Sequence, residues 1–440
     1  MLDSKQKVAR EILERLRGAG FEAYFVGGCV RDLVMGLEPK DYDIATRAHP
    51  DQVLTLFPEA LRVGAQFGVV IVPAEGGPVE VATFRSDSEY ADGRHPAAVR
   101  YAEAASEDVR RRDFTINGLL FDPATRRVID FVGGQEDIRA RRIRTIGDPY
   151  ARFREDHLRM LRAVRFAARF AFGLDARLQE AAHELGALVR EVSRERVRDE
   201  LLKILTDGGA RRGFELLDDL GLLEVVLPEV KALQGVPQPP QFHPEGDVWT
   251  HTMIMLDGLK NPSASLALGV LLHDVGKPST LSVRDRIRFD HHAEVGARMA
   301  ENICSRLRLP LRQTQRVTDL VREHLRFKDL PQMRRSTQLR FLQMEGFDEH
   351  LELHRLDCLA SHGNLSHYKL AQRLLQETPL DQIRPAPLLR GDDLIARGYT
   401  PGPRFKEILR AVEDAQLEGT VRTRTEALTL VESKFPQSVP

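Results

Sequence analysis

The feature that most constrains this 440-residue chain is a change of pattern near residue 140. Before it, short β-rich segments at 67–73 and 79–84 are separated by the turn signal Glu75-Gly76-Gly77. After Asp148, apolar residues recur at helical spacing, at Leu158, Leu161, Val164, Ala168 and Phe172. The pattern predicts a domain of strands and helices up to about residue 140, followed by a helical remainder.

Charge and composition narrow the class of protein. The net charge is −1, but ten arginines stand against three acidic residues between Arg139 and Arg169. Such a stripe suits phosphate contacts, although a solvated helix face has the same pattern. The three cysteines form no CxxC pair, which argues against a disulfide framework or a cysteine zinc site. No run approaches the roughly 20 apolar residues of a membrane helix, and residues 1–16 resemble an amphipathic helix rather than a signal peptide, so we expect a cytoplasmic protein without a membrane partner.

Two glycines follow the strand predicted at 21–26. Gly27 and Gly28 let backbone N–H groups approach a phosphate, and the helix that follows favours anions at its N-terminus. Arg31 would add a bidentate phosphate donor. Two glycines after a strand are more often only a turn, so this signal is weak by itself.

Paired carboxylates come next, at Asp41-Tyr42-Asp43. Residues i and i+2 of a strand share a face, so the two carboxylates repel each other unless a cation lies between them. Oxygen ligands of this kind suit Mg²⁺, and Glu80 on the strand predicted at 79–84 is a plausible third carboxylate. A surface loop is the alternative explanation of the tripeptide.

Two further motifs carry arginine beside aspartate. Arg111-Arg112-Asp113 precedes an apolar segment and would supply charge for a triphosphate. Asp156 and Arg159 lie three apart, so we expect them to be neighbours on one helix. Asp accepts from an exocyclic amine and Arg donates to ring acceptors, so this pair could select cytosine and adenine without a template. A surface ion pair is the alternative.

Together, the motifs GGCVRD, DYD, RRDFTING, EDHLRMLR and SRERVRDEL resemble those of the class II tRNA nucleotidyltransferases, the CCA-adding enzymes, and of the related bacterial poly(A) polymerases. The resemblance is strong over residues ~20–230, and GDDLIARGYTPGP resembles the tail of the family. It implies an α+β fold, with a polymerase-β-like nucleotidyltransferase head of small mixed sheet and helices, then an all-α neck, body and tail.

The resemblance also implies roles for single residues. Asp41 and Asp43, with Glu80 on the strand argument, would be catalytic and bind Mg²⁺. The implied nucleotide-binding residues are Gly27, Gly28, Arg31, Arg112, Asp113, Asp156, Arg159, Arg162 and Arg165. The implied partners are tRNA, ATP and CTP, and the oligomeric state stays open.

Two segments bear on which nucleotide is added. Poly(A) polymerases of this class usually carry a basic pair where Ala65-Gln66 stand, which favours the CCA side of the family. Relatives that add only C are typically shortened at 85–96, whereas this chain keeps an adaptable loop with Asp87, Asp92 and Arg94. The loop favours an enzyme able to add the terminal A, and leaves addition of CCA and addition of A alone both open.

The helical second half contains a histidine–aspartate pattern. His273-Asp274 lies in the apolar segment LGVLLHDVGKP, and burying both is costly unless they share a metal or hydrogen bonds. The order resembles the HD phosphohydrolase superfamily, which implies a divalent metal held by His251, His273, Asp274 and Asp357, with His292 and His324 as further candidates. Some CCA enzymes carry such a domain with phosphatase and 2′,3′-cyclic phosphodiesterase activity. A degenerate HD fold is the alternative.

We therefore predict four domains: a nucleotidyltransferase head at 1–140, a helical neck and body at 141–235, an HD domain at 236–370 and a helical tail at 371–440. The segment 236–244 (VPQPPQFHP) is predicted as a linker. The function expected is addition of C, A or both to tRNA 3′ ends. The alternatives are a poly(A) polymerase, an HD phosphohydrolase with a vestigial head, and a non-catalytic RNA-binding protein, which would gain nothing from paired carboxylates.

Overall fold

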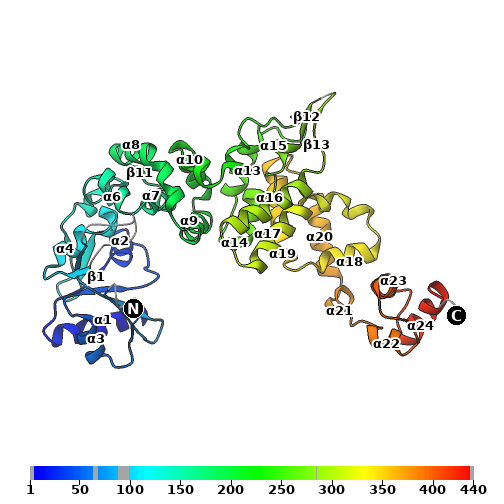
Figure 1. The fold of residues 1–440 in the computed structure, drawn as a ribbon, viewed down its shortest axis with the longest axis horizontal. Coiled ribbons are helices and arrows are strands. Elements are labelled where there is room, and N and C mark those ends of the chain that lie inside the picture. Colours follow the sequence, from blue (N-terminus) through cyan, green and yellow to red (C-terminus); the bar gives the residue numbers. More distant parts are fainter. Residues whose placement is uncertain (1–3, 63–67, 88–98, 284, 437–440) are drawn as a thin grey trace. The chain divides into compact units, whose positions relative to one another are not determined.

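The computed structural model describes residues 4–62, 68–87, 99–283 and 285–436 (Figure 1). The chain divides into two compact units, residues 1–231 and 232–440. Each unit has buried clusters of its own, one around Phe84 and Val109 in the first and others around Phe327 and Ile408 in the second.

A seven-stranded mixed sheet forms the centre of the head, in the order β3-β4-β5-β2-β1-β8-β9. β2 and β5 run parallel, and the other neighbouring strands run antiparallel. The sheet confirms the strands predicted from the glycine-punctuated segments. The strands are β1 (Ala23–Val26), β2 (Asp43–Thr46), β3 (Leu61–Arg62), β4 (Val69–Val72), β5 (Val79–Thr83), β8 (Leu119–Asp122) and β9 (Arg127–Asp130).

Helices of the head accompany this sheet. The strands β6 (Arg85–Asp87) and β7 (Val99–Tyr101) form a separate two-stranded antiparallel sheet. The fold is therefore α+β, as predicted. The head helices are α1 (Ser4–Gly18), α2 (Gly28–Val34), α3 (Pro50–Leu56), α4 (Ala105–Arg110), the 3-10 turn η2 (Thr115–Asn117) and α5 (Gly134–Arg139).

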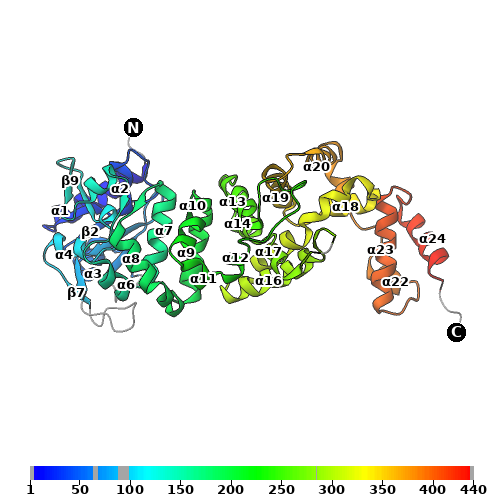
Figure 2. The same cartoon turned by 90° about the horizontal axis from the view of Figure 1, so that it is seen from above.

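The rest of the first unit is helical, apart from the two-residue strands β10 (Arg142–Ile143) and β11 (Gly173–Leu174). The predicted apolar stripe lies on α7, where Leu158, Leu161 and Val164 are buried. Figures 1 and 2 show α7, α9 and α10 side by side. The helices are α6 (Pro149–Glu155), α7 (Leu158–Phe170), α8 (Ala176–Leu185), η3 (Gly186–Glu191), α9 (Arg194–Thr206), α10 (Ala210–Asp219), α11 (Leu222–Val226) and α12 (Pro228–Lys231).

The second unit is helical in its described part, with one short hairpin of β12 (Leu281–Val283) and β13 (Ile287–Phe289). Helix α17 packs against both α14 and α16. The helices are α13 (Val248–Asp257), α14 (Ala264–Leu272), α15 (Lys277–Thr280), α16 (His292–Arg306), α17 (Leu311–Glu323), η4 (His324–Gln332), α18 (Arg335–Leu342), α19 (Phe347–Ala360), α20 (Ser366–Glu377), α21 (Leu380–Ile383), α22 (Gly391–Ile395), α23 (Pro403–Leu417) and α24 (Arg424–Lys434).

The last segment of the second unit has a buried cluster of its own, in which Leu394, Ile408 and Val431 bring α22, α23 and α24 together. Among the helices that the structure describes, none combines the length and the apolar character needed to cross a membrane. The boundaries predicted for the four domains stay predictions, because the compact units group the chain only into two.

A close backbone approach fixes the histidine-bearing part of the second unit. A Cβ atom added to Gly276 would lie 2.2 Å from the His292 carbonyl oxygen and 2.6 Å from the Gly296 nitrogen. Real Cβ atoms do not come this near, so only glycine lets the segment after His273-Asp274 touch the first turns of α16. This contact places His292 beside Asp274.

We expect Gly276→Ala to lower the free energy of unfolding by about 1–3 kcal/mol, because an overpacked site must shift its backbone. Gly402→Ala is the matched control, since its added Cβ would meet nothing within 4 Å. Thermal melts of both variants test this. Equal melting temperatures would contradict the close approach.

Candidate functional site

Three carboxylates of the head lie on two adjoining strands or directly before them. Tyr42, between Asp41 and Asp43, is buried and packs against Phe25, with ring centroids 5.3 Å apart. Asp43 begins β2, and Glu80 lies on the parallel neighbour β5, where Ile44 pairs with Val81. The structure thus brings the predicted third carboxylate to the predicted pair, although Asp41 itself precedes the strand.

The pKa of Asp43 reflects the burial of its carboxyl group and the charges near it. Burial, together with the nearby Glu80 and Asp41 carboxylates, raises the pKa of Asp43 to about 6, against the opposing effect of Arg112. A carboxylate whose charged form is disfavoured by its neighbours is stabilised by a cation among them. The chemistry of the set fits Mg²⁺, which takes oxygen ligands and leaves positions for phosphates and water.

The glycine turn brings Arg112 to these carboxylates. Gly27 has φ +76°, a left-handed conformation that favours glycine, and caps α2. A Cβ added there would lie 3.4 Å from Arg112 Nη1. Arg112 donates to the buried Asp108 at 2.9 Å. The turn therefore leaves room for an oriented guanidinium beside the carboxylates.

In this structure, the side chains of Arg31 and Asp113 are held by internal partners. Arg31 is 4% exposed, donates to Asp32 at 2.7 Å and to Asn117 Oδ1 at 2.6 Å, and lies over the Phe170 ring. Burial alone would raise the pKa of Asp113, but its ion pair with Arg162, at 2.5 Å, lowers that pKa to about 2. Direct nucleotide contacts by Arg31 and Asp113 stay predictions, and the structure shows both in internal ion pairs.

Asp156 and Arg159 do not share one helix, so that expectation was wrong. α6 ends at Glu155, and Asp156 follows in an extended conformation (φ −150°). Its Oδ1 accepts a hydrogen bond from the N–H of Leu158, the first residue of α7, at 3.1 Å. Asp156 Oδ2 also accepts from Arg196 at 2.8 Å. Arg159 donates to Glu155 at 2.5 Å. The two side chains remain close in the chain, but each has its own partner.

The arginines of α7 pair with carboxylates from other elements. Arg165 lies 2.7 Å from Glu200 of α9, and Arg162 pairs with Asp113 of the head. Sequence reasoning missed Arg196 and Glu200 as partners. Both belong to the SRERVRDEL motif, so that motif was the signal that could have found them.

Two predicted features lie wholly or partly outside the described residues. Asp87 ends β6, whereas Asp92 and Arg94 of the predicted loop lie outside the described residues, and so do Ala65 and Gln66. The loop argument stays a prediction from the sequence.

All six predicted HD residues come together in the second unit. His251 Nε2 lies 3.2 Å from Asp357 Oδ1, and His273 Nε2 lies 3.0 Å from Asp274 Oδ2. His292 and His324 approach Asp274 Oδ1 at 3.5 and 3.8 Å. The donor atoms form two compact groups within which they lie within 4.8 Å of one another: His251, His273 and Asp357, and Asp274, His292 and His324.

Hydrogen bonds at the other ring nitrogens decide what these groups can hold. The Nδ1 atoms of His273, His292 and His324 contact the carbonyl oxygens of Val270, Phe289 and Val321 at 2.7–2.8 Å. A carbonyl only accepts, so Nδ1 carries the proton and each Nε2 presents a lone pair. Within the described part of the chain, the Nε2 atoms of His273 and His292 are buried and make no hydrogen bond. Lone pairs facing carboxylates fit a divalent metal ion.

Ionisation agrees with this arrangement. Burial alone would lower the pKa of His251, but Asp357 and Glu245 raise it to about 9, so a proton can stand between ring and carboxylate when no cation does. Burial lowers the pKa of His324 to about 3, which keeps that ring neutral and able to bind a metal.

Sequence reasoning missed Glu245 and His243. Glu245 accepts from His251 Nδ1 at 2.7 Å and lies 2.9 Å from His243 Nδ1. Gln238, in the segment predicted as a linker, is 4% exposed and bonded to Lys277 at 2.6 Å. That part of the segment is folded against the site rather than linking domains, and the run of His and Glu before His251 was the available signal.

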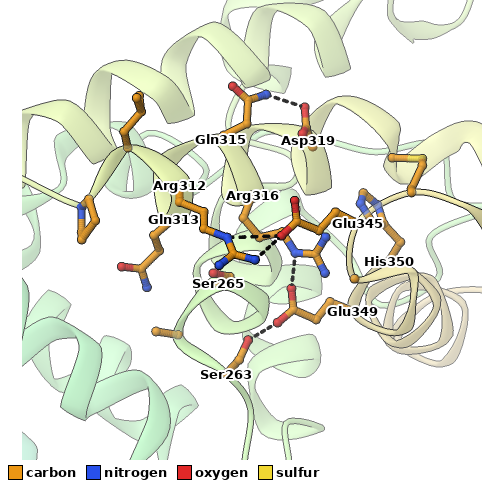
Figure 3. Close-up of a pocket in the computed structure, with 15 residues that line it drawn as sticks. Ser263, Ser265, Arg312, Gln313, Gln315, Arg316, Asp319, Glu345, Glu349 and His350 are labelled. Carbon is orange, nitrogen blue, oxygen red and sulfur yellow. Dashed lines mark hydrogen bonds and ion pairs between the residues drawn. The ribbon is translucent and has the colours of Figure 1, made fainter. Parts of the chain in front are cut away.

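A cavity of about 1010 Å³ also lies in the second unit (Figure 3). Its charged side chains pair with each other, Arg312 with Glu345 and Arg316 with Glu349. No predicted site residue is among the described residues that line it, so the metal-ligand groups remain the candidate site of this unit.

We expect Glu80→Gln to lower the pKa of Asp43 from about 6 towards its usual value, because one repelling charge is removed. Arg112→Ala should raise the same pKa further. Carboxyl NMR titration of Mg²⁺-free protein measures both changes, and the exposed Glu59→Gln is the control. If the Asp43 pKa is unchanged in Glu80→Gln, the charge of Glu80 does not act on the Asp43 carboxyl group.

Comparison with known proteins agrees with this geometry. Residues 23–144 match the poly A polymerase head domain, 171–234 match the probable RNA and SrmB- binding site of polymerase A, and 247–357 match the HD domain. The curated CCA-adding enzyme of Geobacillus sp. (strain WCH70) is 47% identical over 211 residues, which are 48% of this chain and 52% of that protein. That of Lactobacillus helveticus (strain DPC 4571) is 40% identical over 253 residues, 56% of this chain and 63% of that protein.

The chain thus spans between about half and two thirds of the length of these relatives. Over nearly its whole length it resembles the crystal structure of the Bacillus stearothermophilus CCA-adding enzyme in complex with CTP, with a TM-score of 0.72, 28% identity and 98% of both chains covered. The resemblance inferred from the motifs is confirmed. The chain therefore has a nucleotidyltransferase head of the poly A polymerase type, a segment that matches the probable RNA and SrmB- binding site of polymerase A, and an HD domain, in the fold of the CCA-adding enzymes.

Proposed function

We propose that this chain adds C, A or both to the 3′ end of tRNA without a template, using CTP, ATP and Mg²⁺. The observation that carries the proposal is the crowding of Asp41, Asp43 and Glu80 beside Arg112. The resemblance to CCA-adding enzymes supplies the substrate class. An RNA-binding protein without catalysis would gain nothing from three carboxylates that repel phosphate.

The three carboxylates would hold Mg²⁺, which supplies charge neutralisation for the triphosphate and activation of the 3′-hydroxyl. Arg112, oriented by Asp108, would donate to phosphate oxygens. The Gly27 turn keeps Cβ atoms out of the space between them. These residues of the chain bind and orient the triphosphate end of the nucleotide.

Selection of the base is proposed for Asp156 and Arg159. Asp156 has carboxylate lone pairs for an exocyclic amine, and Arg159 has guanidinium N–H groups for a ring acceptor. Their present partners, Arg196 and Glu155, hold both side chains in place before a nucleotide arrives. Arg162 and Arg165 support α7 through Asp113 and Glu200. Full CCA addition, addition of A alone and poly(A) synthesis remain the alternatives, and the retained loop at 85–96 favours an A-adding enzyme.

We expect Asp43→Ala or Asp41→Ala to reduce nucleotide addition about a thousandfold, since loss of a catalytic metal removes several kcal/mol of transition-state stabilisation. The assay uses tRNA transcripts that end before CCA, after one C and after CC, each with a single labelled nucleotide. Asp51→Ala, a surface ion-pair variant of the same head, should retain activity.

The three transcripts also separate the nucleotide programmes. A full CCA enzyme extends all of them, whereas an enzyme that adds A alone extends only the transcript ending in CC. If Asp43→Ala adds nucleotides at the wild-type rate, the carboxylates of the head do not catalyse nucleotide addition.

A second activity, metal-dependent phosphohydrolysis, is favoured by the convergence of His251, His273, Asp274, His292, His324 and Asp357. The substrate class proposed from the HD resemblance is phosphate monoesters and 2′,3′-cyclic phosphates. The intact carboxylates of the head argue against a hydrolase with a vestigial head. The identity of the metal is left to the test below.

We expect His273→Ala to lose bound divalent metal and all hydrolysis while nucleotide addition continues, because the two sets of ligands lie in separate units. His350→Ala is the matched control, being another buried histidine with unpartnered ring nitrogens outside the ligand groups. Metal analysis and hydrolysis assays with Mg²⁺, Mn²⁺, Ni²⁺ and Co²⁺ test this. A wild-type protein that binds none of these metals would have a degenerate site.

A further inference from the structure

Gln238 lies inside the HD site although its segment has no regular structure. The side chain is 4% exposed. Two backbone hydrogen bonds hold the segment in place, from Val248 N to Val236 O at 3.1 Å and from His243 N to Pro239 O at 3.0 Å. Gln238 is therefore presented by a fixed turn.

The partner of Gln238 is the buried cation of the site. Lys277 Nζ donates to Gln238 Oε1 at 2.6 Å and to Asp274 Oδ2 at 2.7 Å, and it lies 5.2 Å from the centre of the Phe289 ring. Asp274 belongs to the ligand group of His292 and His324. Through this shared carboxylate, Lys277 and Gln238 lie beside the proposed metal position.

The bond to Lys277 also fixes which way the amide faces. An ammonium group only donates, so it must meet Oε1, and the Gln238 NH₂ group is turned elsewhere. Nε2 is buried and has no hydrogen-bond partner among the residues that the structure describes. A buried donor without an acceptor is costly, so it indicates a partner that arrives with the substrate.

We propose that Gln238 Nε2 and Lys277 Nζ together hold a phosphoryl oxygen of the phosphate monoester or cyclic phosphodiester hydrolysed at the HD site. The proposal rests on the second activity proposed above. A metal ion, an ammonium and an amide donor around one point suit an oxyanion that offers several oxygens, as phosphate does. Gln238 thereby becomes a substrate-binding residue contributed by the segment before α13.

The test measures binding of inorganic phosphate to the full-length protein loaded with Mn²⁺, by calorimetry. Gln238→Leu keeps the volume without the donor, and Gln238→Glu replaces the donor by an acceptor that can still pair with Lys277. We expect both to weaken phosphate binding roughly tenfold or more, the effect of one hydrogen bond to a charged group. Mn²⁺ affinity and nucleotide addition should stay at wild-type levels.

The control is Gln241→Glu, which adds the same charge to an exposed position of the same segment and should leave phosphate binding unchanged. A purely structural role for Gln238 predicts that Gln238→Glu, which preserves the bond to Lys277, binds phosphate like wild type. That result, or wild-type phosphate binding by Gln238→Leu, overturns the inference while leaving the metal site intact. A wild-type protein that takes up no Mn²⁺ overturns both the inference and the proposed hydrolase.

Discussion

Ion pairs along α7, buried or partly buried, are the interactions on which the first unit depends. Arg162 reaches Asp113 of the head, Arg165 reaches Glu200 of α9, and Arg159 reaches Glu155 at the end of α6. Ion pairs therefore connect α7 to the head, to α9 and to the end of α6. Of the three pairs, Arg165 and Glu200 are both buried, and breaking a pair of this kind costs about 3–5 kcal/mol because it leaves an uncompensated charge. A substitution in this network will change stability as well as nucleotide binding, so the two effects need separate measurements.

Both candidate sites follow one physical rule. The fold holds groups that repel one another close together, and a bound cation removes the repulsion. In the head the groups are carboxylates around Asp43, whose pKa is raised by burial and then by the neighbouring charges of Glu80 and Asp41. In the second unit they are the imidazole lone pairs of His273, His292 and His324, which face Asp274.

Periodicity and local chemistry predicted much of this arrangement. The buried stripe of α7 and the approach of Glu80 to Asp41 and Asp43 follow from residue type and spacing, whereas the six HD residues were implied by the resemblance to the HD superfamily. The break at Asp156 was not predicted, because it depends on a capping bond and on Arg196, forty residues further along the chain. The burial of Arg31 and the position of Gln238 escaped prediction for the same reason. Whether a polar side chain faces a ligand or an internal partner is decided by residues distant in sequence.

The hydrogen bonds from His273, His292 and His324 to backbone carbonyls have a thermodynamic consequence. The rings are anchored at helix ends by the chain itself, so the binding site exists before any ion enters it. Little conformational entropy is then lost on metal uptake, unlike in small zinc domains that fold only around their ion. Exchange of one metal for another becomes a local event in an already ordered pocket, and the choice among metals falls to coordination chemistry and supply.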